Sequence, residues 1–282
     1  PMARQFLTGI GLAIALICAA GPALAQSNTT AGQGTDNNTH PMLETTPQPP
    51  FVASDPSNEF ANWAVAVVAG DWRSSQGQPI HAFENSRRDL FAAFDRAGFA
   101  TDNMTALSLA PAADGTFLGA QRAFAAIESV ARRGAAGCLL YFTSHGSPAG
   151  IVWGPDGMMP PAMMNQLIDR WCGTRPTVVV VSACYSGVFV PALAQPNRMI
   201  MTAARRDRSS FGCSEDATYP YFDGCVLEAL NDARDFLSLS MRATACVNRR
   251  EREEGLRPPS EPQTYVGAQM QALLPFLQFS AP

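Results

Sequence analysis

The residues TVVVVSACYSG, at positions 177–187, carry the strongest structural signal in this chain. Positions 177–183 form an unbroken apolar run with consecutive valines. β-Branched residues on both faces of such a run predict a strand of a parallel sheet that is covered on both sides. Cys184 follows directly, and reacting groups gather at the carboxyl ends of parallel strands. We therefore expect the thiol of Cys184 at this edge of the sheet, which we call the rim.

A second apolar run, at positions 138–143, ends in the same way at Ser144, His145 and Gly146. The other two histidines lie elsewhere, His40 in a polar tail and His81 in a predicted loop. Taken singly, Cys184 would be interpreted as a buried packing residue and His145 as a loop histidine. A thiol and an imidazole at the ends of two strands, each with glycine nearby, instead predict a nucleophile and its base.

The surrounding motifs resemble those of a known family. The residues YFTSHGS at positions 141–147 are similar to the histidine motif of the legumain (asparaginyl endopeptidase) family, and SACYSG at 182–187 resembles its cysteine motif. The similarity extends to the opening strand and to two later segments, so that it covers about Asn62 to about Ala268: positions 63–70, 209–213 and 221–224. Legumains belong to the wider caspase-like group. The resemblance implies a cysteine endopeptidase with His145 and Cys184 as its dyad.

The fold that the resemblance implies is an α/β caspase-like sandwich, with a mainly parallel central β-sheet and helices on both faces. The apolar spacing agrees with it, because predicted strands and helices alternate, as in a parallel sheet with right-handed crossovers. The predicted strands are 62–70, 103–109, 138–143, 177–183, 198–202 and 263–266. The predicted helices are 82–97, 116–133, 160–171, 226–235 and 237–252.

The resemblance also implies a substrate pocket between the cysteine strand and the loop at positions 203–211. Four residues are expected on its walls: Ser182, Ser209, Ser210 and Asp223. The alternative for the serines is that they only end strands and cap turns. Arg73 and His81, in the first loops, are further candidates, with a plain surface role as the alternative.

Three departures from the family pattern bear on specificity. Ser182 stands where plant and animal legumains carry an acidic residue and metacaspases an aspartate, and Ser144 stands where the family has an aspartate. No counterpart of the family's pocket arginine is found near Ile80 and His81. Cleavage after Asn or Asp is therefore expected without a strict preference for Asn, and Asp223 would supply the pocket with a charge.

The chemistry expected of the dyad follows from the thiol. An ordinary cysteine, with a pKa near 8.5, is mostly protonated at neutral pH, so Cys184 needs a base, which His145 supplies before it protonates the leaving amine. We expect the backbone N–H groups of Gly146 and Cys184 to hold the oxyanion, each donor contributing about 3–4 kcal/mol. On this view, Gly146→Val lowers turnover far more than stability.

The first 25 residues are typical of a secretory signal, with Arg4, an apolar stretch at positions 10–20 and Ala-Leu-Ala before Gln26. The apolar stretch is shorter than the roughly 20 residues that a membrane span needs. We expect cleavage after Ala25 rather than lipid anchoring at Cys18. Positions 26–58 predict a disordered leader, with a propeptide over the active site as the alternative. Positions 59–282 then form one peptidase domain of an exported, bacterial-type protein, periplasmic or secreted.

Composition excludes several other functions. All basic residues are arginine, so a phosphate-binding P-loop, which needs lysine, is ruled out. The arginines are scattered in pairs and the net charge is −4, which argues against nucleic-acid binding. Neither Cys-x-x-Cys nor His-Glu-x-x-His occurs, so we expect no metal and no cofactor. The expected partner is a peptide or protein substrate, with no membrane span after the signal.

Six cysteines follow the predicted signal, and an exported chain meets oxidising conditions. Cys138 and Cys172 both lie at the amino-terminal edges of predicted strands, either as buried thiols or as a pair. One disulfide is expected among the three cysteines of the last third: Cys213, Cys225 and Cys246.

Two other functions remain open on sequence alone. One is a non-catalytic caspase-fold module that binds a partner, because a fold does not guarantee activity. The other is a transpeptidase with the same dyad, in which an amine intercepts the acyl-enzyme before water does.

Overall fold

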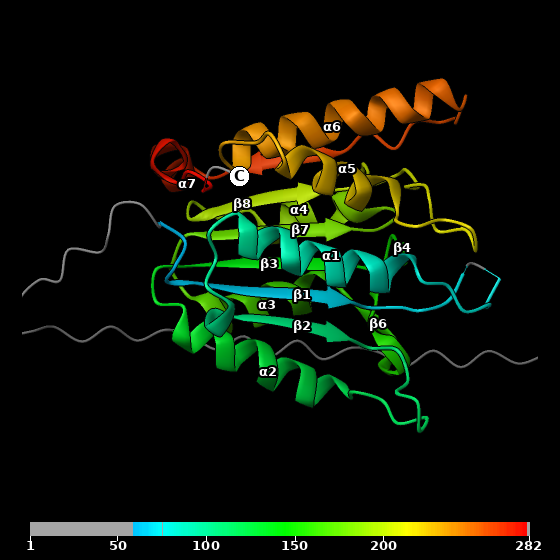
Figure 1. Ribbon diagram of the computed structural model, residues 1–282, viewed down its shortest axis with the longest axis horizontal. Helices are drawn as coiled ribbons and strands as arrows, with labels where there is room; N and C mark the ends of the chain where they lie inside the picture. The colour runs from blue at the N-terminus through cyan, green and yellow to red at the C-terminus, as the bar shows by residue number, and fades with distance from the viewer. Residues whose placement is uncertain (1–58, 75, 281–282) are drawn as a thin grey trace, which may run out of the picture. The chain divides into compact units, whose positions relative to one another are not determined.

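The valine-rich run lies at the centre of a six-stranded sheet in the computed structural model, which describes residues 59–74 and 76–280 (Figure 1). The strands are β1 (Trp63–Ala69), β2 (Met104–Ser108), β3 (Gly137–Thr143), β7 (Thr177–Ser182), β8 (Arg198–Thr202) and β9 (Gln263–Val266). Their order is β2-β1-β3-β7-β8-β9. Neighbours pair in parallel except β9, which is antiparallel to β8 at the sheet edge.

Helices and a small second sheet complete the fold. The helices are α1 (Ala82–Arg96), α2 (Ala120–Arg133), α3 (Pro161–Cys172), α4 (Phe189–Leu193), α5 (Tyr221–Leu230), α6 (Phe236–Glu253) and α7 (Ala268–Leu273). Single 3-10 turns lie at Thr101–Asn103, Gly154–Asp156, Ser186–Val188 and Leu274–Phe276. The second sheet has the order β4-β5-β6, from β4 (Gly146–Ser147), β5 (Gly150–Val152) and β6 (Met158–Met159).

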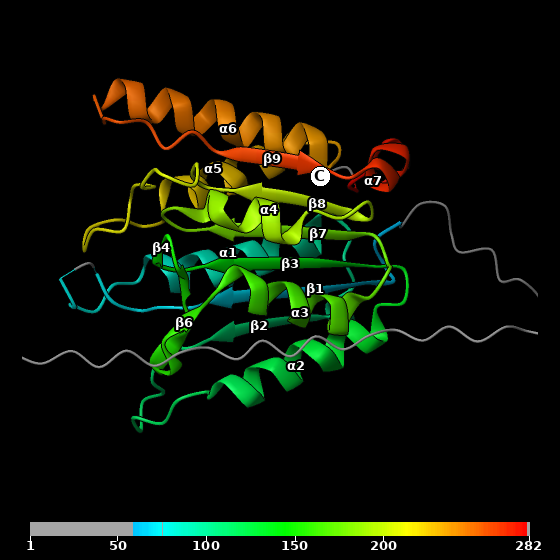
Figure 2. The same cartoon turned by 180° about the vertical axis from the view of Figure 1, so that it is seen from behind.

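The central strands bury both faces, and successive side chains point into two separate cores. Leu139 and Val178 belong to the core under α1, α5 and α6, the helices in front of the sheet in Figure 1. Leu140 and Val179 belong to the core under α2, α3 and α4, and Figure 2 shows the sheet from this second side. The predicted α/β fold, with a mainly parallel sheet between two layers of helices, is thereby confirmed.

The element boundaries differ from the predicted ones where short-range signals are weak. Helix α5 begins at Tyr221 rather than at position 226, directly after Pro220, which supplies a fixed φ for a helix start. Helix α2 begins at Ala120 rather than at position 116. The backbone N–H of Ala120 donates to a carboxylate oxygen of Asp156 at 2.9 Å. The sheet β4-β5-β6 and helix α4 were not predicted, because elements this short show no periodicity.

The predicted signal at positions 1–25 and the predicted leader at 26–58 lie outside the described residues. Within the part of the chain that the structure describes, no helix is long and apolar enough to cross a membrane.

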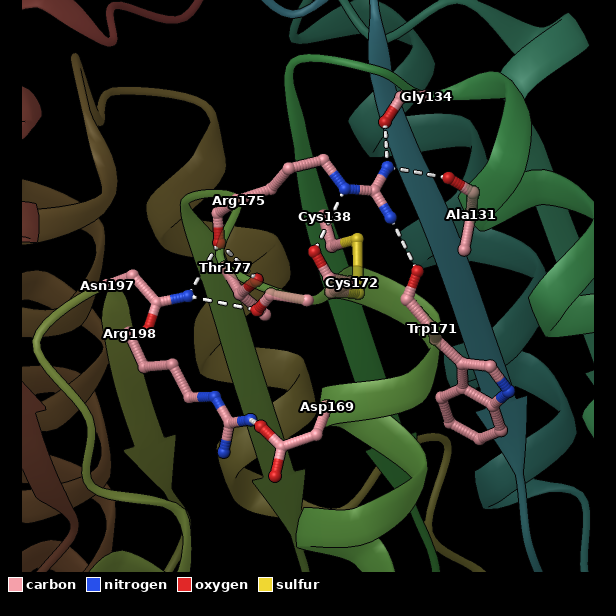
Figure 3. Close-up of a disulfide and its surroundings, with 11 residues drawn as sticks. Ala131, Gly134, Cys138, Asp169, Trp171, Cys172, Arg175, Thr177, Asn197 and Arg198 are labelled. Atoms are coloured by element: carbon pink, nitrogen blue, oxygen red, sulfur yellow. Dashed lines mark hydrogen bonds and ion pairs between the residues drawn. A yellow bond between two sulfur atoms is a disulfide. The ribbon is translucent and has the colours of Figure 1, made fainter.

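Each of the two cores contains one disulfide. Cys138 of β3 is bonded to Cys172 at the end of α3, with their Cα atoms 6.2 Å apart (Figure 3). Cys225 of α5 is bonded to Cys246 of α6. The structure thus selects the pair among the alternatives for Cys138 and Cys172, and it confirms one disulfide in the last third.

The guanidinium of Arg175 lies close to the Cys138–Cys172 disulfide and stabilises the same region. The side chain of Arg175 donates to four backbone carbonyls, of Ala131, Gly134, Trp171 and Cys172 (Figure 3). These carbonyls lie at or just past the carboxyl ends of α2 and α3, where helices leave acceptors without partners. Arg175 therefore ends two helices at once and ties them to each other.

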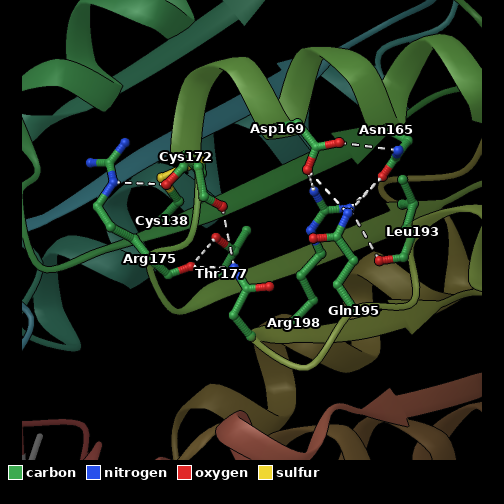
Figure 4. Close-up of polar contacts among 11 residues, drawn as sticks. Cys138, Asn165, Asp169, Cys172, Arg175, Thr177, Leu193, Gln195 and Arg198 are labelled. Carbon is green, nitrogen blue, oxygen red and sulfur yellow. Dashed lines mark hydrogen bonds and ion pairs between the residues drawn. A yellow bond between two sulfur atoms is a disulfide. The ribbon is translucent and has the colours of Figure 1, made fainter. Parts of the chain in front are cut away.

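A second arginine lies deeper in this region. Arg198 is fully buried, and its guanidinium donates to Asp169 Oδ1 at 2.7 Å, Asn165 Oδ1 at 2.7 Å and the carbonyl of Leu193 at 3.1 Å (Figure 4). It thereby links β8 to α3 and α4. The amino-terminal side of the sheet is held by one covalent bond and two charged groups.

We expect Arg175→Met to lower the free energy of unfolding by about 1–3 kcal/mol. The methionine side chain has no N–H donor, so the four backbone carbonyls lose the charged donor that they accept from. Urea unfolding under non-reducing conditions measures the change. The matched control is Arg170→Met on α3, whose exposed side chain makes one surface ion pair with Glu128. We expect little change there. Equal losses in both variants would show that the four carbonyl contacts do not stabilise the fold.

Candidate active site

The register of β3 and β7 brings the two predicted catalytic residues together. Thr143 pairs with Ser182 in the parallel ladder, and the N–H of Ser144 continues it to the carbonyl of Ser182 at 3.1 Å. His145 and Cys184 each lie two residues beyond this last pair. They therefore leave neighbouring strands at the same level of the rim, as the sequence predicted.

The two loops touch at Gly146. A Cβ atom on Gly146 would lie 2.2 Å from the carbonyl oxygen of Cys184 and 2.9 Å from Cβ of Ala183. Only glycine permits this approach, because any side chain would push against the backbone that carries the thiol. The substitution Gly146→Val would displace the strand end as well as the site, so we expect a substantial loss of stability beside the loss of turnover.

The ring of His145 is oriented from two sides. Its Nε2 lies 2.7 Å from the backbone carbonyl oxygen of Arg73, and the ring packs against Phe83 at 5.1 Å between centroids and 84° between planes. A carbonyl oxygen only accepts, so Nε2 carries the proton. In the neutral ring Nδ1 is then the nitrogen that can take a proton, which is the tautomer a base needs.

A buried carboxylate fixes the carbonyl that holds His145. Asp71 is 4% exposed and accepts from the backbone N–H of Trp72 at 2.8 Å, the N–H of Arg73 at 3.2 Å and Nε of Arg73 at 2.8 Å. Arg73 thus contributes its backbone to the site, while its side chain lies over the Trp72 ring. Asp71 was missed from sequence, although an acidic residue directly after a strand end is a usable signal. His81 lies exposed at the start of α1.

Cys184 lies against the loop that follows β8. Its Sγ accepts from the N–H of Ser210 at 3.3 Å and contacts the carbonyl oxygen and Oγ of Ser210 at 3.5 Å. The N–H of Tyr185 donates to the carbonyl of Arg208 at 2.7 Å. Ser210 is thus next to the sulfur, and Ser209 between these contacts is exposed. Their place on the wall of a substrate pocket stays a prediction. No hydrogen bond joins Cys184 to His145.

Two backbone donors are open at this point. The N–H of Cys184 donates to no other residue within 59–74 or 76–280. Gly146 pairs with Ile151 while the N–H of Val152 donates to the carbonyl of His145, so Gly146 occupies a non-hydrogen-bonded position. In such a position the N–H points away from the partner strand.

The last third of the chain anchors the loop after β8. The N–H of Arg205 donates to the carbonyl of Ser260 at 2.8 Å, and its guanidinium pairs with Glu261 at 2.6 Å. The N–H of Ser260 in turn donates to the buried carboxylate of Glu251 on α6. The loop that contacts Cys184 is therefore held by residues that come long after it in the sequence.

Asp223 and Ser182, predicted as pocket walls, lie behind the rim instead. Asp223 is fully buried and Ser182 is 2% exposed. The hydroxyls of Tyr141 and Thr143 donate to the Asp223 carboxylate at 2.6 and 2.5 Å. Burial raises the pKa of Asp223, and the hydroxyls around it, including that of Ser182, act in the opposite direction. The wall assignment is wrong for both residues, because α5 packs its first turn onto β3.

Cys213 is the other free thiol among the described residues. It packs beside the cluster that contains Ile80 and Phe83. Burial raises the pKa of the Cys213 thiol, and the nearby charges of Cys184 and Asp223 add to this effect. Cys213 is therefore held as a neutral thiol, so Cys184 is the thiol placed for chemistry.

Clusters of metal-ligand side chains are absent from the described part of the chain. It contains no group of three or more His, Cys, Asp or Glu side chains that could hold an ion.

Comparisons with known proteins found one matching family model and similar solved structures. Residues 117–243 match the model of the Peptidase C13 family, and this segment contains both His145 and Cys184. Among solved structures, caspase-1 from Spodoptera frugiperda is similar in fold, with a TM-score of 0.54 and 14% sequence identity over 74% of this chain and 88% of that chain. No curated protein matches the sequence.

Proposed function

We propose that this chain is a legumain-like cysteine endopeptidase in which Cys184 attacks the peptide bond and His145 transfers the proton. The match of residues 117–243 to the Peptidase C13 family model and the caspase-like sheet support this proposal. The observation that carries the proposal is the register of β3 and β7, which delivers both residues to one level of the rim. The bond from Nε2 of His145 to the carbonyl of Arg73 supports the role of Nδ1 as the base.

The proposed reaction has two stages. Sγ of Cys184 gives its proton to His145 and bonds to the carbonyl carbon, and the tetrahedral intermediate then expels the amine, which takes the proton from His145. Water next attacks the thioester, with His145 again as the base, and releases the acid. The open N–H groups of Cys184 and Gly146 support an oxyanion site at this carbonyl.

The substrate is proposed to lie along the extended segment at positions 208–210. Arg208 contacts Tyr185 and Ser210 contacts Cys184, while Ser209 between them is exposed. An incoming peptide could therefore approach this segment at Ser209. An extended peptide can pair with such an unpaired edge through its backbone. For the residue before the cut we propose Asn or Asp, on the family resemblance alone.

Export is also part of the proposal. Both disulfides are buried, and bonds of this kind form and persist in oxidising compartments. The predicted signal would direct the chain to the periplasm or the medium.

The test is a cleavage assay coupled to thiol mapping. The protein is incubated with a peptide library in mildly reducing buffer, before and after treatment with iodoacetamide, and both the cut sites and the alkylated cysteine are identified by mass spectrometry. We expect cuts that disappear as Cys184 becomes labelled, with Cys213 labelled far more slowly because of its raised pKa.

Either of two results would overturn the proposal. One is the absence of cuts by unlabelled protein, which would favour a binding module with this fold. The other is cleavage that persists when Cys184 is fully alkylated. An added amine that becomes joined to the new carboxyl ends would show transpeptidation by the same dyad.

A further inference from the structure

A pocket of about 520 Å³ lies beside the rim, on the side of Cys184 that faces away from β3. It is formed by the turn after Cys184, the start of the loop after β8 and the first residue of β9. Apolar side chains of α4, Val190 and Pro191, form one wall, and Arg205, Arg206, Asp207 and Gln263 form the other. Its walls thus combine a hydrophobic surface with guanidinium groups.

The charges around this pocket do not balance. Arg205 pairs with Asp207 at 2.6 Å and with Glu261 at 2.6 Å, and Arg208 pairs with Asp207 at 3.1 Å. Arg206 is exposed and makes no ion pair or side-chain hydrogen bond with any residue that the structure describes. The charged residues that line the pocket are two arginines, Arg205 and Arg206, and one aspartate, Asp207, which leaves one positive charge at the pocket without compensation.

The backbone of Arg206 is fixed relative to the nucleophile. A Cβ atom on Gly187 would lie 2.4 Å from the backbone nitrogen of Arg206, so the two segments are in close contact. Gly187 follows Cys184 by three residues, a span of at most about 10 Å at 3.3–3.6 Å per residue. An extended substrate would cover this distance with about three residues.

We propose that this pocket is a substrate subsite that takes an acidic side chain, with glutamate favoured. Arg206 binds the carboxylate, and the methylene groups of glutamate pack on Val190 and Pro191. The acidic residue lies within about three residues of the scissile bond and is distinct from the residue before the cut. This inference rests on the proposed function and names a class of substrate for it.

The test uses matched peptide pairs. In the peptide that the library shows to be cut best, each position within four residues of the cut is replaced by Glu and, separately, by Gln. We expect one position at which Glu is cut about 3–10 times faster than Gln in kcat/KM, and a smaller ratio at high salt. In Arg206→Gln the ratio should fall to about one, and Arg206→Lys should restore part of it.

The matched control is Arg242→Gln on α6, whose exposed side chain likewise has no partner among the described residues. It should leave the ratio unchanged. Equal rates for Glu and Gln at every position, or a ratio that persists in Arg206→Gln, would overturn the subsite.

A binding assay distinguishes failure of the proposed subsite from failure of the proposed peptidase activity. Fluorescein-labelled octapeptides that carry Glu or Gln at each position are titrated into Cys184→Ala and Cys184→Ala/Arg206→Gln, with fluorescence anisotropy as the readout. If the wild-type protein cuts no peptide in the library, a preference of Cys184→Ala for Glu that is lost in Cys184→Ala/Arg206→Gln would support the subsite and contradict the peptidase. Binding without such a preference would sink the subsite whatever the cleavage assay gives.

Discussion

Alanine in place of Cys184 should abolish peptide cleavage, and alanine in place of His145 should lower kcat/KM by about 10²–10⁴-fold. The first loss is total because the acyl-enzyme cannot form. The second is partial, since a thiol that ionises without a base still reacts slowly. Initial rates on the best-cut peptide measure both effects.

The two residues should also behave as one unit. The double variant is expected to be no slower than Cys184→Ala alone, because a base without a nucleophile contributes nothing. In His145→Ala the rate at which iodoacetamide labels Cys184 should fall as well, which ties the loss to the thiol rather than to substrate binding.

Matched controls come from the same residue types. Cys213→Ala and His81→Ala should each retain activity, because burial raises the pKa of the Cys213 thiol and keeps it neutral, and His81 is exposed at the start of α1. Comparable losses in a control and in its counterpart would mean that the dyad is assigned to the wrong pair.

The second large effect is on stability. Asp223→Ala should lower the free energy of unfolding by about 3–5 kcal/mol, because it leaves buried hydroxyls without an acceptor and opens space in the core. The hydroxyls of Tyr141 and Thr143 lose their partner directly. Asp223→Asn should cost less, since the amide keeps an oxygen that can accept. Urea unfolding of the three proteins measures the difference.

The pH dependence of the same variants gives an independent check. Burial raises the pKa of Asp223 above its ordinary value of 3.8, so the folded protein binds this proton more tightly than the unfolded chain. Binding of this proton therefore stabilises the folded protein. This contribution to the free energy of unfolding is fully present below pH 3.8 and is lost as the pH rises through the raised pKa of the folded protein. Relative to Asp223→Asn, the wild-type protein should therefore lose stability over this window. A difference that stays constant with pH would show that the proton is not involved.

The sequence predicted the parts of the site that lie at strand ends. Valine-rich runs identify buried parallel strands, and a residue that directly follows such a run must emerge at the rim, which suffices for Cys184 and His145. Asp223 was different, because the predicted helix began after it. With α5 starting at Tyr221, Asp223 falls in the first turn and faces β3, where it is buried.

Other features depend on packing that a single sequence does not display. The role of Asp71 requires knowing that the carbonyl of Arg73 meets a histidine 72 residues further on. The choice of Cys225 and Cys246 over Cys213 depends on how α5 and α6 lie against each other. In each case the deciding contact joins elements that are distant in the chain.

The anchoring of the active-site loop by Ser260 and Glu251 has a consequence for biosynthesis. A chain emerging from the ribosome presents the dyad long before it presents these residues, and β9, which closes the sheet beside β8, comes later still. Until then the loop that contacts the sulfur lacks the contacts of Arg205 with Ser260 and Glu261. On the proposed function, the site would therefore be completed only after residues 251–266 have been made, long after the dyad itself.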